Sequence, residues 1–526
     1  MLHSGAVGVE LNPQSEPYRL GRYVVRRVER AFDSVFGSKL NPLRHLGSLG
    51  FLFFWLVAIS GIYLYAVLDT SVSGAYRSID DLSSRQWYLG GVLRSVHRYS
   101  ADAFIIVSVA HLIREWVFGH FRGFRRFSWL TGVPLLLFAF ACGVGGFWLN
   151  WDQLGQFSAQ ATAEWLDALP LFASPLTRNF LNTAAVTDRL FSLLVFIHLG
   201  LPLLLLFGLW FHIQRISLAD VFPPRALAAG VTAMLFLLAA FAPVMSHPAA
   251  DLSQVPPTLA IDWILLFVHP LMYVTSAGFV WAILVSALLL LLLLPFLPQK
   301  RIMPVAKVDP DNCNGCRRCF DDCPYAAVTM VPHSDGRLGR EMAQVDADLC
   351  ASCGICVGAC PSSTPFRSVA ELVTGIDLPN SPINFLRQQL HAELARLETD
   401  RKIVVFGCDQ GASVDGLRDR DVAVFSLVCA GMLPPSFVEY ALRDGASGVL
   451  VSGCRAGGCE FRLGQKWTEA RLLSVREPHL RTSVPRDSVQ VVWADTGDEV
   501  ALNVALKALR QRVTSAKVPP PVMESI

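Results

Sequence analysis

The stretch RSVHRYSADAFIIVSVAHLIRE at residues 94–115 carries two histidines fourteen residues apart, in an apolar segment long enough to cross a bilayer. A second apolar stretch, HLGLPLLLLFGLWFH at 198–212, repeats the same interval. Fourteen residues are close to four helical turns, so the two histidines of each stretch lie on one helix face, about 21 Å apart. An imidazole without a partner is costly in lipid. The equal spacings therefore predict two stacked sites, each binding a haem between two histidines.

The order of the predicted membrane spans gives the pairing of these histidines. The second and fourth spans both run from the outer to the inner face, which places His97 opposite His198 near the outside and His111 opposite His212 near the inside. Hydrogen bonding between helices is the alternative role for a membrane histidine. We predict six spans, at about 47–68, 91–118, 129–149, 188–214, 227–246 and 277–298.

The composition agrees with a membrane protein that has a soluble second half. Only 17% of the residues are charged, the mean hydropathy is +0.42, and the apolar residues concentrate before about position 298. Twelve of the thirteen cysteines follow that position. The net charge of +2 is too small and too dispersed for nucleic-acid binding.

Basic residues indicate the orientation. The positive-inside rule places them in the cytoplasm, and six spans return the chain to the side on which it starts. The N-terminus shows no secretory signal pattern. We expect a multi-pass protein of the bacterial inner membrane, with its N-terminus and its cysteine-rich half in the cytoplasm. The basic residues are Arg22, Arg26, Arg27, Arg30, Arg44, Arg122, Arg125, Arg126, Lys300 and Arg301.

Four glycines repeat the fourteen-residue interval, as Gly47 with Gly61 on the first span and Gly132 with Gly146 on the third. Glycine lets a bulky ring approach the backbone, so these are candidate haem-facing gaps, with simple helix packing as the alternative. Together with these residues, several motifs make the region resemble the cytochrome b subunit of bc-type quinol oxidoreductases. The resemblance implies haem b at both sites, a quinone substrate and a homodimeric assembly. The motifs are NPLRHLGSLG at 41–50, RSVHRYSAD at 94–102, HLIRE at 111–115 and WLNWDQLGQFSA at 148–159.

Residues 227–300 resemble the next two helices of that family. Its members carry a Pro-Glu-Trp-Tyr motif between them, whose glutamate takes a proton from quinol, and here the matching residues are Ile-Asp-Trp-Ile at 261–264. The resemblance implies a catalytic role for Asp262 at the quinol site, and a solvated loop carboxylate is the alternative. His269 and Asp152 are further candidates nearby.

Two copies of the pattern Cys-x2-Cys-x2-Cys-x3-Cys-Pro lie at 313–324 and 350–361. In this spacing three thiolates bind one cluster and the fourth binds the other. Structural zinc and disulfides are the alternatives, the latter disfavoured in a reducing cytoplasm. Residues 304–366 resemble bacterial two-cluster ferredoxins. One 4Fe-4S cluster is expected on Cys313, Cys316, Cys319 and Cys360, and the second on Cys350, Cys353, Cys356 and Cys323.

A third region alternates strand-like runs with a helical FVEYALRDGA, which predicts a small α/β domain. The runs KIVVFGC, VAVFSLVC and GVLVSGC place cysteines at strand ends, where Cys408, Cys429, Cys454 and Cys459 converge. A 2Fe-2S cluster fits four such thiolates, with zinc or inert thiols as alternatives. The stretch GASGVLVSGCRAGGCEFRLG at 445–464 resembles the delta subunit of methyl-viologen-reducing hydrogenase. That family passes electrons to heterodisulfide-reductase-A-like flavoproteins.

Two further features complete the prediction of an all-α transmembrane haem-binding bundle followed by an α+β ferredoxin-like and a small α/β soluble domain. Residues 17–36 predict an amphipathic helix that either lies on the membrane surface or caps the bundle. Cys142 is predicted to be a buried, unreactive thiol. The expected segments are 1–46 (N-terminus with the surface helix), 47–216 (di-haem core), 217–300 (two further spans), 301–366 (ferredoxin domain), 367–400 (linker and helix), 401–512 (delta-subunit-like domain) and 513–526 (tail).

These motifs predict an electron carrier between the membrane quinone pool and a cytoplasmic flavoprotein or dehydrogenase subunit. Nucleotide chemistry belongs to such a partner, because the Gly-rich segments here surround cysteines and form no strand-bounded GxGxxG. One rival is a bc-type quinol oxidoreductase with Rieske and cytochrome c partners and an added cytoplasmic electron exit. Another is a redox sensor or assembly scaffold.

Overall fold

A computed structural model describes residues 16–170, 175–176, 181, 185–254, 258–297 and 304–515. Lys300 and Arg301 of the predicted orientation signal, and most of the predicted tail, lie outside these ranges. The chain divides into two compact units. The helical unit contains the described residues of 16–214 and 219–297, and the iron–sulfur unit contains those of 304–515 together with Arg215–Leu218.

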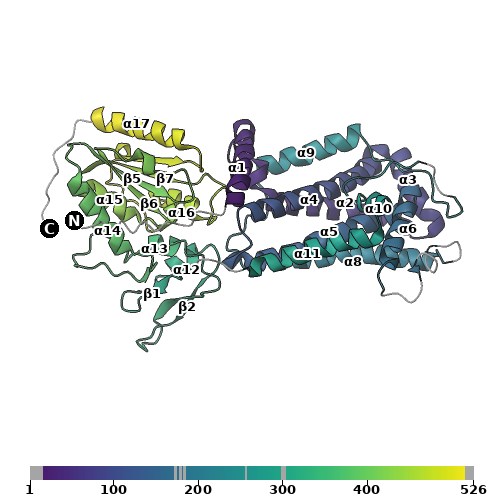
Figure 1. Ribbon diagram of the computed structural model, residues 1–526, viewed down its shortest axis with the longest axis horizontal. Helices are drawn as coiled ribbons and strands as arrows, with labels where there is room; N and C mark the ends of the chain where they lie inside the picture. Colours follow the sequence, from purple (N-terminus) through teal and green to yellow (C-terminus); the bar gives the residue numbers. More distant parts are fainter. Residues whose placement is uncertain are drawn as a thin grey trace. The chain divides into compact units, whose positions relative to one another are not determined.

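The helical unit is a bundle of long apolar helices (Figure 1). Helix α2 packs against α4, α5 packs against α8, and α4 also contacts α5 and α9. Shorter helices, α3, α6 and α10, lie at one end of the bundle (Figure 1). The helices are α1 (Glu16–Phe36), α2 (Leu46–Val67), α3 (Val72–Ser84), α4 (Val92–Val117), α5 (Arg126–Asn150), α6 (Gln153–Asp167), α8 (Asp188–Ile213), α9 (Arg225–Phe241), α10 (Val268–Val274) and α11 (Ala277–Leu293).

The predicted count of six spans is not confirmed. Four helical segments among the described residues are long and apolar enough to cross a membrane: Leu46–Val67, Gly123–Asn150, Asp188–Ile213 and Ala277–Phe296. The other two predicted windows coincide with helices α4 and α9. Helix α9 has only 17 residues, and α4 is interrupted by charged side chains, which lowers its apolar character.

Helix α1 forms over the predicted amphipathic segment. One face joins the end of α4, where Arg22 donates 2.6 Å to the Phe118 carbonyl and the buried Glu29 pairs with Arg114 at 3.0 Å. Another face leaves Tyr23 and Val24 exposed. The helix therefore caps the bundle and still presents apolar side chains outward, so both predicted roles remain compatible with its packing.

The iron–sulfur unit combines a ferredoxin-like part with an α/β part. A parallel four-stranded sheet has the order β6-β5-β7-β8, and its two central strands, β5 and β7, are almost entirely buried. The predicted strands over KIVVFGC, VAVFSLVC and GVLVSGC are confirmed as β5, β6 and β7. The elements are β1 (Lys307–Val308), α12 (Arg318–Asp322), β2 (Val328–Pro332), β3 (Glu341–Val345), α13 (Ile355–Ala359), β4 (Ile376–Asp377), α14 (Ile383–Arg396), β5 (Lys402–Cys408), β6 (Val422–Leu427), α15 (Pro435–Arg443), β7 (Ala446–Gly453), α16 (Gly464–Leu472), β8 (Val489–Trp493) and α17 (Glu499–Ser515).

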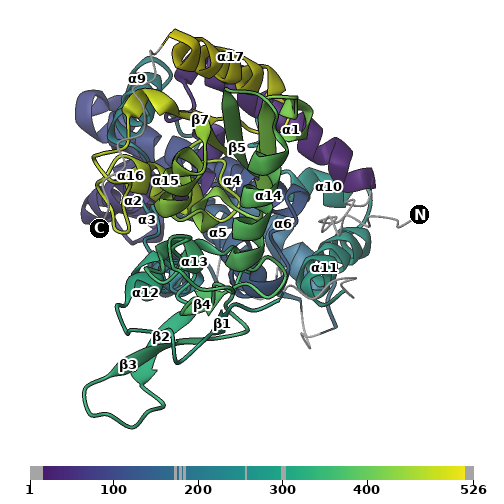
Figure 2. The ribbon, with the colours of Figure 1, turned by 90° about the vertical axis from the view of Figure 1, so that its left-hand side faces the viewer.

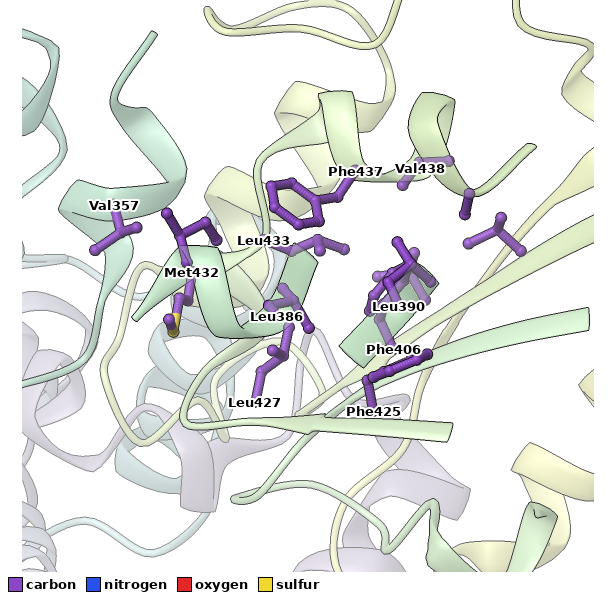
Figure 3. Packing of buried hydrophobic residues seen from close by; sticks show 14 of the residues in the cluster. Val357, Leu386, Leu390, Phe406, Phe425, Leu427, Met432, Leu433, Phe437 and Val438 are labelled. Carbon is purple, nitrogen blue, oxygen red and sulfur yellow. The ribbon is translucent and has the colours of Figure 1, made fainter. Parts of the chain in front are cut away.

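One hydrophobic core joins both parts of this unit. It contains Val357 of α13, Leu386 and Leu390 of α14, Phe406 of β5 and Phe437 of α15, and Figure 3 shows these side chains facing one another. The segment predicted as a linker with a helix thus supplies core residues to both neighbours. Because a shared core resists relative motion, the two parts hold a fixed mutual arrangement. Helices α12 and α13 lie between the β2–β3 hairpin and the sheet (Figures 1 and 2).

Candidate metal centres

The four membrane histidines lie on two helices of the bundle. His97 and His111 are on α4, and His198 and His212 are on α8. His97 interacts electrostatically with His198, and His212 with His111. The structure thus brings the histidines together in the two predicted pairs.

The Nδ1 atom of each ring has a neighbour within the protein. That of His97 lies 3.0 Å from the Val57 carbonyl, and that of His212 lies 3.0 Å from the Thr131 hydroxyl. The other two contacts are longer: 3.7 Å from His198 to the Cys142 sulfur, and 3.8 Å from His111 to the Glu115 carboxylate. A ring that donates from Nδ1 keeps a lone pair on Nε2, the form that binds iron. None of the four Nε2 atoms has a hydrogen-bond partner among the described residues.

The four predicted glycines each face one of these imidazoles. A Cβ atom at Gly61 would lie 2.9 Å from His97 Cε1, and at Gly47 3.5 Å from His111 Cε1. Cβ atoms at Gly146 and Gly132 would each lie 3.1 Å from Cε1 of His198 and His212. The glycines therefore make room for the histidine rings, a contact that the sequence interval alone did not specify.

An apolar layer separates the two histidine levels. Phe54, Ile105, Ala139 and Leu205 form one buried cluster, with one residue from each of α2, α4, α5 and α8. Each lies at or next to the middle of the fourteen-residue interval on its helix. Two separate cofactor sites, and not one long cavity, fit this arrangement.

Asp262 is held by fixed partners. Its Oδ1 accepts hydrogen bonds from the backbone N–H groups of Ile264 (3.0 Å) and Leu265 (2.7 Å), and its Oδ2 pairs with Arg98. Arg98 also pairs with Asp102 and stacks 4.6 Å from the Phe147 ring. The alternative of a freely solvated loop carboxylate does not describe this environment.

The two further candidates near Asp262 differ from each other. Asp152 accepts from the backbone N–H groups of Gly155 and His247, both at 2.9 Å, so it caps α6. His269 is buried, and its Nε2 lies 2.9 Å from the Thr162 hydroxyl. The Nδ1 of His269 has no partner in the described part of the chain.

The ferredoxin-like part contains two cavities. The first has an empty volume of about 310 Å³ and is lined by Cys313, Cys316, Cys319 and Cys360. The second, of about 360 Å³, is lined by Cys323, Cys350, Cys353 and Cys356. These are the two cysteine sets that the spacing assigns to separate clusters. The thiols surround a volume, and no three His, Cys, Asp or Glu side chains in the described ranges are placed around a single metal ion. The donor set fits 4Fe-4S clusters.

The backbone of the repeat explains how the thiols surround these cavities. Gly315 and Ser352 occupy equivalent positions and both have positive φ, as do Arg317 and Gly354 at the start of the following helices. These left-handed residues turn each Cys-x2-Cys-x2-Cys loop back on itself. Burial raises the pKa of the Cys319 thiol to about 12 and that of Cys356 well above its usual value, so the protons of these thiols leave when metal binds.

The third cysteine set converges at one edge of the parallel sheet. Cys408 ends β5, Cys454 directly follows β7, and Cys429 follows β6 after one intervening residue. The thiols of Cys408 and Cys459 each contact those of Cys429 and Cys454, so the four form a closed ring. Hydrogen bonding within this ring raises the pKa of Cys429 and Cys454 and lowers that of Cys408 and Cys459. A Cβ at Gly464 would lie 2.2 Å from the Cys429 sulfur. Four convergent thiols fit a small iron–sulfur cluster.

Three known domain families match successive parts of the chain. A cytochrome b/b6/petB model matches residues 32–218, a 4Fe-4S dicluster domain model matches 312–364, and a model of the delta subunit of methyl-viologen-reducing hydrogenase matches 403–516. The chain is a fusion of these three domains. It is a multi-pass membrane protein and a membrane electron-transfer subunit, with haem b implied by the first domain and iron–sulfur clusters by the second.

A solved structure titled "Hyperthermophilic respiratory Complex III" is also similar to this fusion chain. The identity is 21% and the TM-score 0.41, and the match covers 53% of this chain and 83% of that one.

Sequence reasoning missed several residues that contact the candidate ligands. Cys142 was predicted to be an inert core thiol, and it lies beside His198. Thr131 contacts His212, and the Ser60 hydroxyl lies 3.2 Å from His97 Nδ1. A usable signal existed, because Ser60 and Thr131 directly precede Gly61 and Gly132.

Proposed function

We propose that this fusion protein transfers electrons between the membrane quinone pool and a soluble cytoplasmic redox partner. The proposal rests chiefly on one observation: a single chain carries two facing histidine pairs in a helical bundle and three cysteine sets in a soluble unit. Two b haems, two 4Fe-4S clusters and one 2Fe-2S cluster are the groups that these five sets would hold. When bound, such groups take up and release single electrons.

The residues of the bundle would bind and orient the two haems. The Nδ1 contacts of His97 and His212 hold those rings in the tautomer that offers Nε2, and Gly61 and Gly132 give the rings space. The apolar layer at Phe54 and Leu205 excludes water between the two levels. Electron transfer between the levels would move charge across the bilayer of a bacterial inner membrane. Proteoliposomes that develop a membrane potential during quinone reduction would support this electrogenic step, and the absence of a potential would contradict it.

We propose that Asp262 handles the proton at the outer quinone site. A general base must be held in a fixed position near the proton that it accepts, and Arg98 with two backbone N–H groups holds the Asp262 carboxylate in place. Asp262→Asn should lower quinol oxidation about 100-fold or more while haem content stays constant. Asp152→Asn is the matched control, because Asp152 caps a helix in the same unit. Equal losses in both variants would reject the role of Asp262.

The soluble partner would be a flavoprotein of the heterodisulfide-reductase-A type or a related dehydrogenase subunit, in keeping with the delta-subunit-like domain. The distribution of basic residues favours a cytoplasmic position for that domain under the positive-inside rule. We also propose that the chain forms a homodimer, by resemblance to the cytochrome b family. Mass spectrometry of subunits that co-purify from membranes tests the partner. A periplasmic Rieske or haem c subunit in that preparation would favour the bc-type alternative instead.

The decisive test combines spectroscopy with turnover. Purified protein should show two b-haem transitions in a visible redox titration and three iron–sulfur signals by electron paramagnetic resonance. Quinol should reduce the haems within the turnover time of the enzyme. Haems that quinol leaves oxidised would contradict the proposed function, and so would iron–sulfur signals that never exchange electrons with them.

A further inference from the structure

The two cysteine-lined cavities of the ferredoxin-like part differ in how closely their cysteine loops pack against the α/β part of the same unit. Cys353 and Cys356 flank Gly354 and Ile355, and this loop with α13 packs against Ala430–Met432, the turn that follows Cys429. The residues that line the other cavity come mainly from the first cysteine loop, from Met330 and Ala343 of the hairpin, and from the segment around β4, and only Cys360, directly after α13, comes from the second cysteine loop.

Glycines bring the two ligand-bearing turns into backbone contact. A Cβ at Gly358 would lie 2.2 Å from the Gly431 carbonyl oxygen, and a Cβ at Gly431 would lie 2.8 Å from the Ile355 side chain. A Cβ at Gly354 would lie 2.8 Å from the Met432 side chain. Even one added methyl group would force these turns apart, so nothing separates the loop of Cys353 and Cys356 from the turn after Cys429.

A buried arginine joins these turns. Arg471 of α16 is fully buried and donates to the Gly431 carbonyl (2.8 Å) and to the Ile355 carbonyl (3.3 Å). Its guanidinium also pairs with Asp322, the residue directly before Cys323. Arg471 therefore contacts the turn after Cys429, the loop between Cys353 and Cys356, and the neighbour of Cys323.

The charge at this junction is not balanced by the single carboxylate. Asp322 also accepts from Arg476 Nε at 2.7 Å, so one buried acid faces two arginines. Arg471 interacts electrostatically with Cys429, and its Nε–H is buried with no partner among the described residues. Removing a guanidinium from water is costly unless it gains comparable interactions. A nearby anionic centre would supply them.

We propose that Arg471 is a positioning residue that couples the centre on Cys408, Cys429, Cys454 and Cys459 to the 4Fe-4S centre on Cys323, Cys350, Cys353 and Cys356. This inference rests on the proposed function and adds an order to it, because electrons pass between the α/β part and the ferredoxin-like part through this cluster and not through the one on Cys313. One electron leaves the reduced centre and enters the oxidised one, and no bond forms or breaks. The positive charge of Arg471 stabilises the reduced, more negative state of both neighbouring iron–sulfur centres.

The test uses the full-length protein and redox titration followed by electron paramagnetic resonance. Arg471→Gln removes the charge, Arg471→Lys keeps it, and Arg510→Gln removes an arginine that pairs with Asp419 and Asp421 elsewhere in the unit. We expect Arg471→Gln to make reduction of the two flanking centres about tenfold less favourable, which is about 59 mV for one electron. Arg471→Lys should restore most of that loss, and Arg510→Gln should cause none. Unchanged potentials in Arg471→Gln, or an equal shift of all three centres, would overturn the proposal.

A second measurement covers the case in which Arg471→Gln fails to fold. Cys316 is exposed, so Cys316→Ser should delete only the cluster on Cys313, Cys316, Cys319 and Cys360. Magnetic coupling between the α/β centre and the remaining 4Fe-4S cluster should persist in this variant, and its disappearance would overturn the proposed order. Quinol-driven haem reduction in the same samples tests the proposed function separately, because it does not depend on Arg471.

Discussion

The helical unit and the iron–sulfur unit hold their candidate ligands by opposite means. In the bundle, His97 and His111 are spaced along one continuous helix, and each has its own glycine and its own Nδ1 contact. In the iron–sulfur unit, the cysteines lie in loops whose backbones pack into one shared core, and Cys356 itself belongs to that core. We therefore expect the loss of a ligand to have a local effect in the bundle and a wider effect in the iron–sulfur unit.

The largest expected effect comes from a buried cysteine. Cys356→Ala should remove one 4Fe-4S cluster and destabilise the whole iron–sulfur unit by about 3 kcal/mol, or roughly 6–12 °C in Tm, because metal binding contributes to folding and this residue lies in the shared core. Iron analysis and calorimetry measure both effects. The exposed Cys316 gives the matched variant, Cys316→Ala, which should lose a cluster with a much smaller change in Tm. Equal Tm changes in the two variants would contradict the expectation that the shared core spreads the effect of losing a buried ligand.

A histidine variant tests the local behaviour of the bundle. His198→Ala should lower the haem content from two per chain to one, because only one of the two paired sites loses a ligand. Circular dichroism should remain that of the unsubstituted protein. Pyridine haemochrome analysis gives the haem count, and the loss of both haems would show that the two levels are coupled through the bundle despite the apolar layer.

Two glycines provide a graded version of this test. Gly61→Ala places a Cβ 2.9 Å from the His97 ring and should cost about 1–3 kcal/mol through overpacking, visible as a loss or a shifted potential of the His97–His198 haem. Gly47→Ala adds the same atom 3.5 Å from the His111 ring, an ordinary contact, and should be tolerated. A larger loss in Gly47→Ala than in Gly61→Ala would mean that these glycines are needed for helix packing and not to make room for the histidine rings.

The smallest expected effects concern the side chains of Thr131 and Cys142, which contact the histidine rings. Thr131→Val removes the 3.0 Å contact to His212 Nδ1 and should weaken haem retention at the His111–His212 site about tenfold, because second partners orient the ligand ring. The sulfur of Cys142 lies farther from its histidine, at 3.7 Å, so Cys142→Ala should change the other site less. Titration of both haem potentials in each variant measures the difference.

Much of both units could be predicted from residue spacing. The fourteen-residue interval depends only on helix geometry, so it was sufficient to predict two histidine levels, and the direction of the two helices then paired His97 with His198 and His111 with His212. The duplicated cysteine pattern likewise anticipated which thiols line each cavity, since the loops are short and repeat each other. The span count was harder, because α4 combines membrane length with charged side chains that pair inside the protein, such as Arg98 with Asp262.

What the sequence by itself determined were the properties that local geometry controls: the ligand types, their intervals and the strand-end positions of Cys408 and Cys454. Only the tertiary structure decided which residues lie against these ligands from distant parts of the chain. Arg471 is 149 residues from Asp322, and Cys142 is 56 residues from His198. Such contacts depend on how separate elements pack together, and a periodic pattern within one element carries no information about the side chains that the next element brings to it.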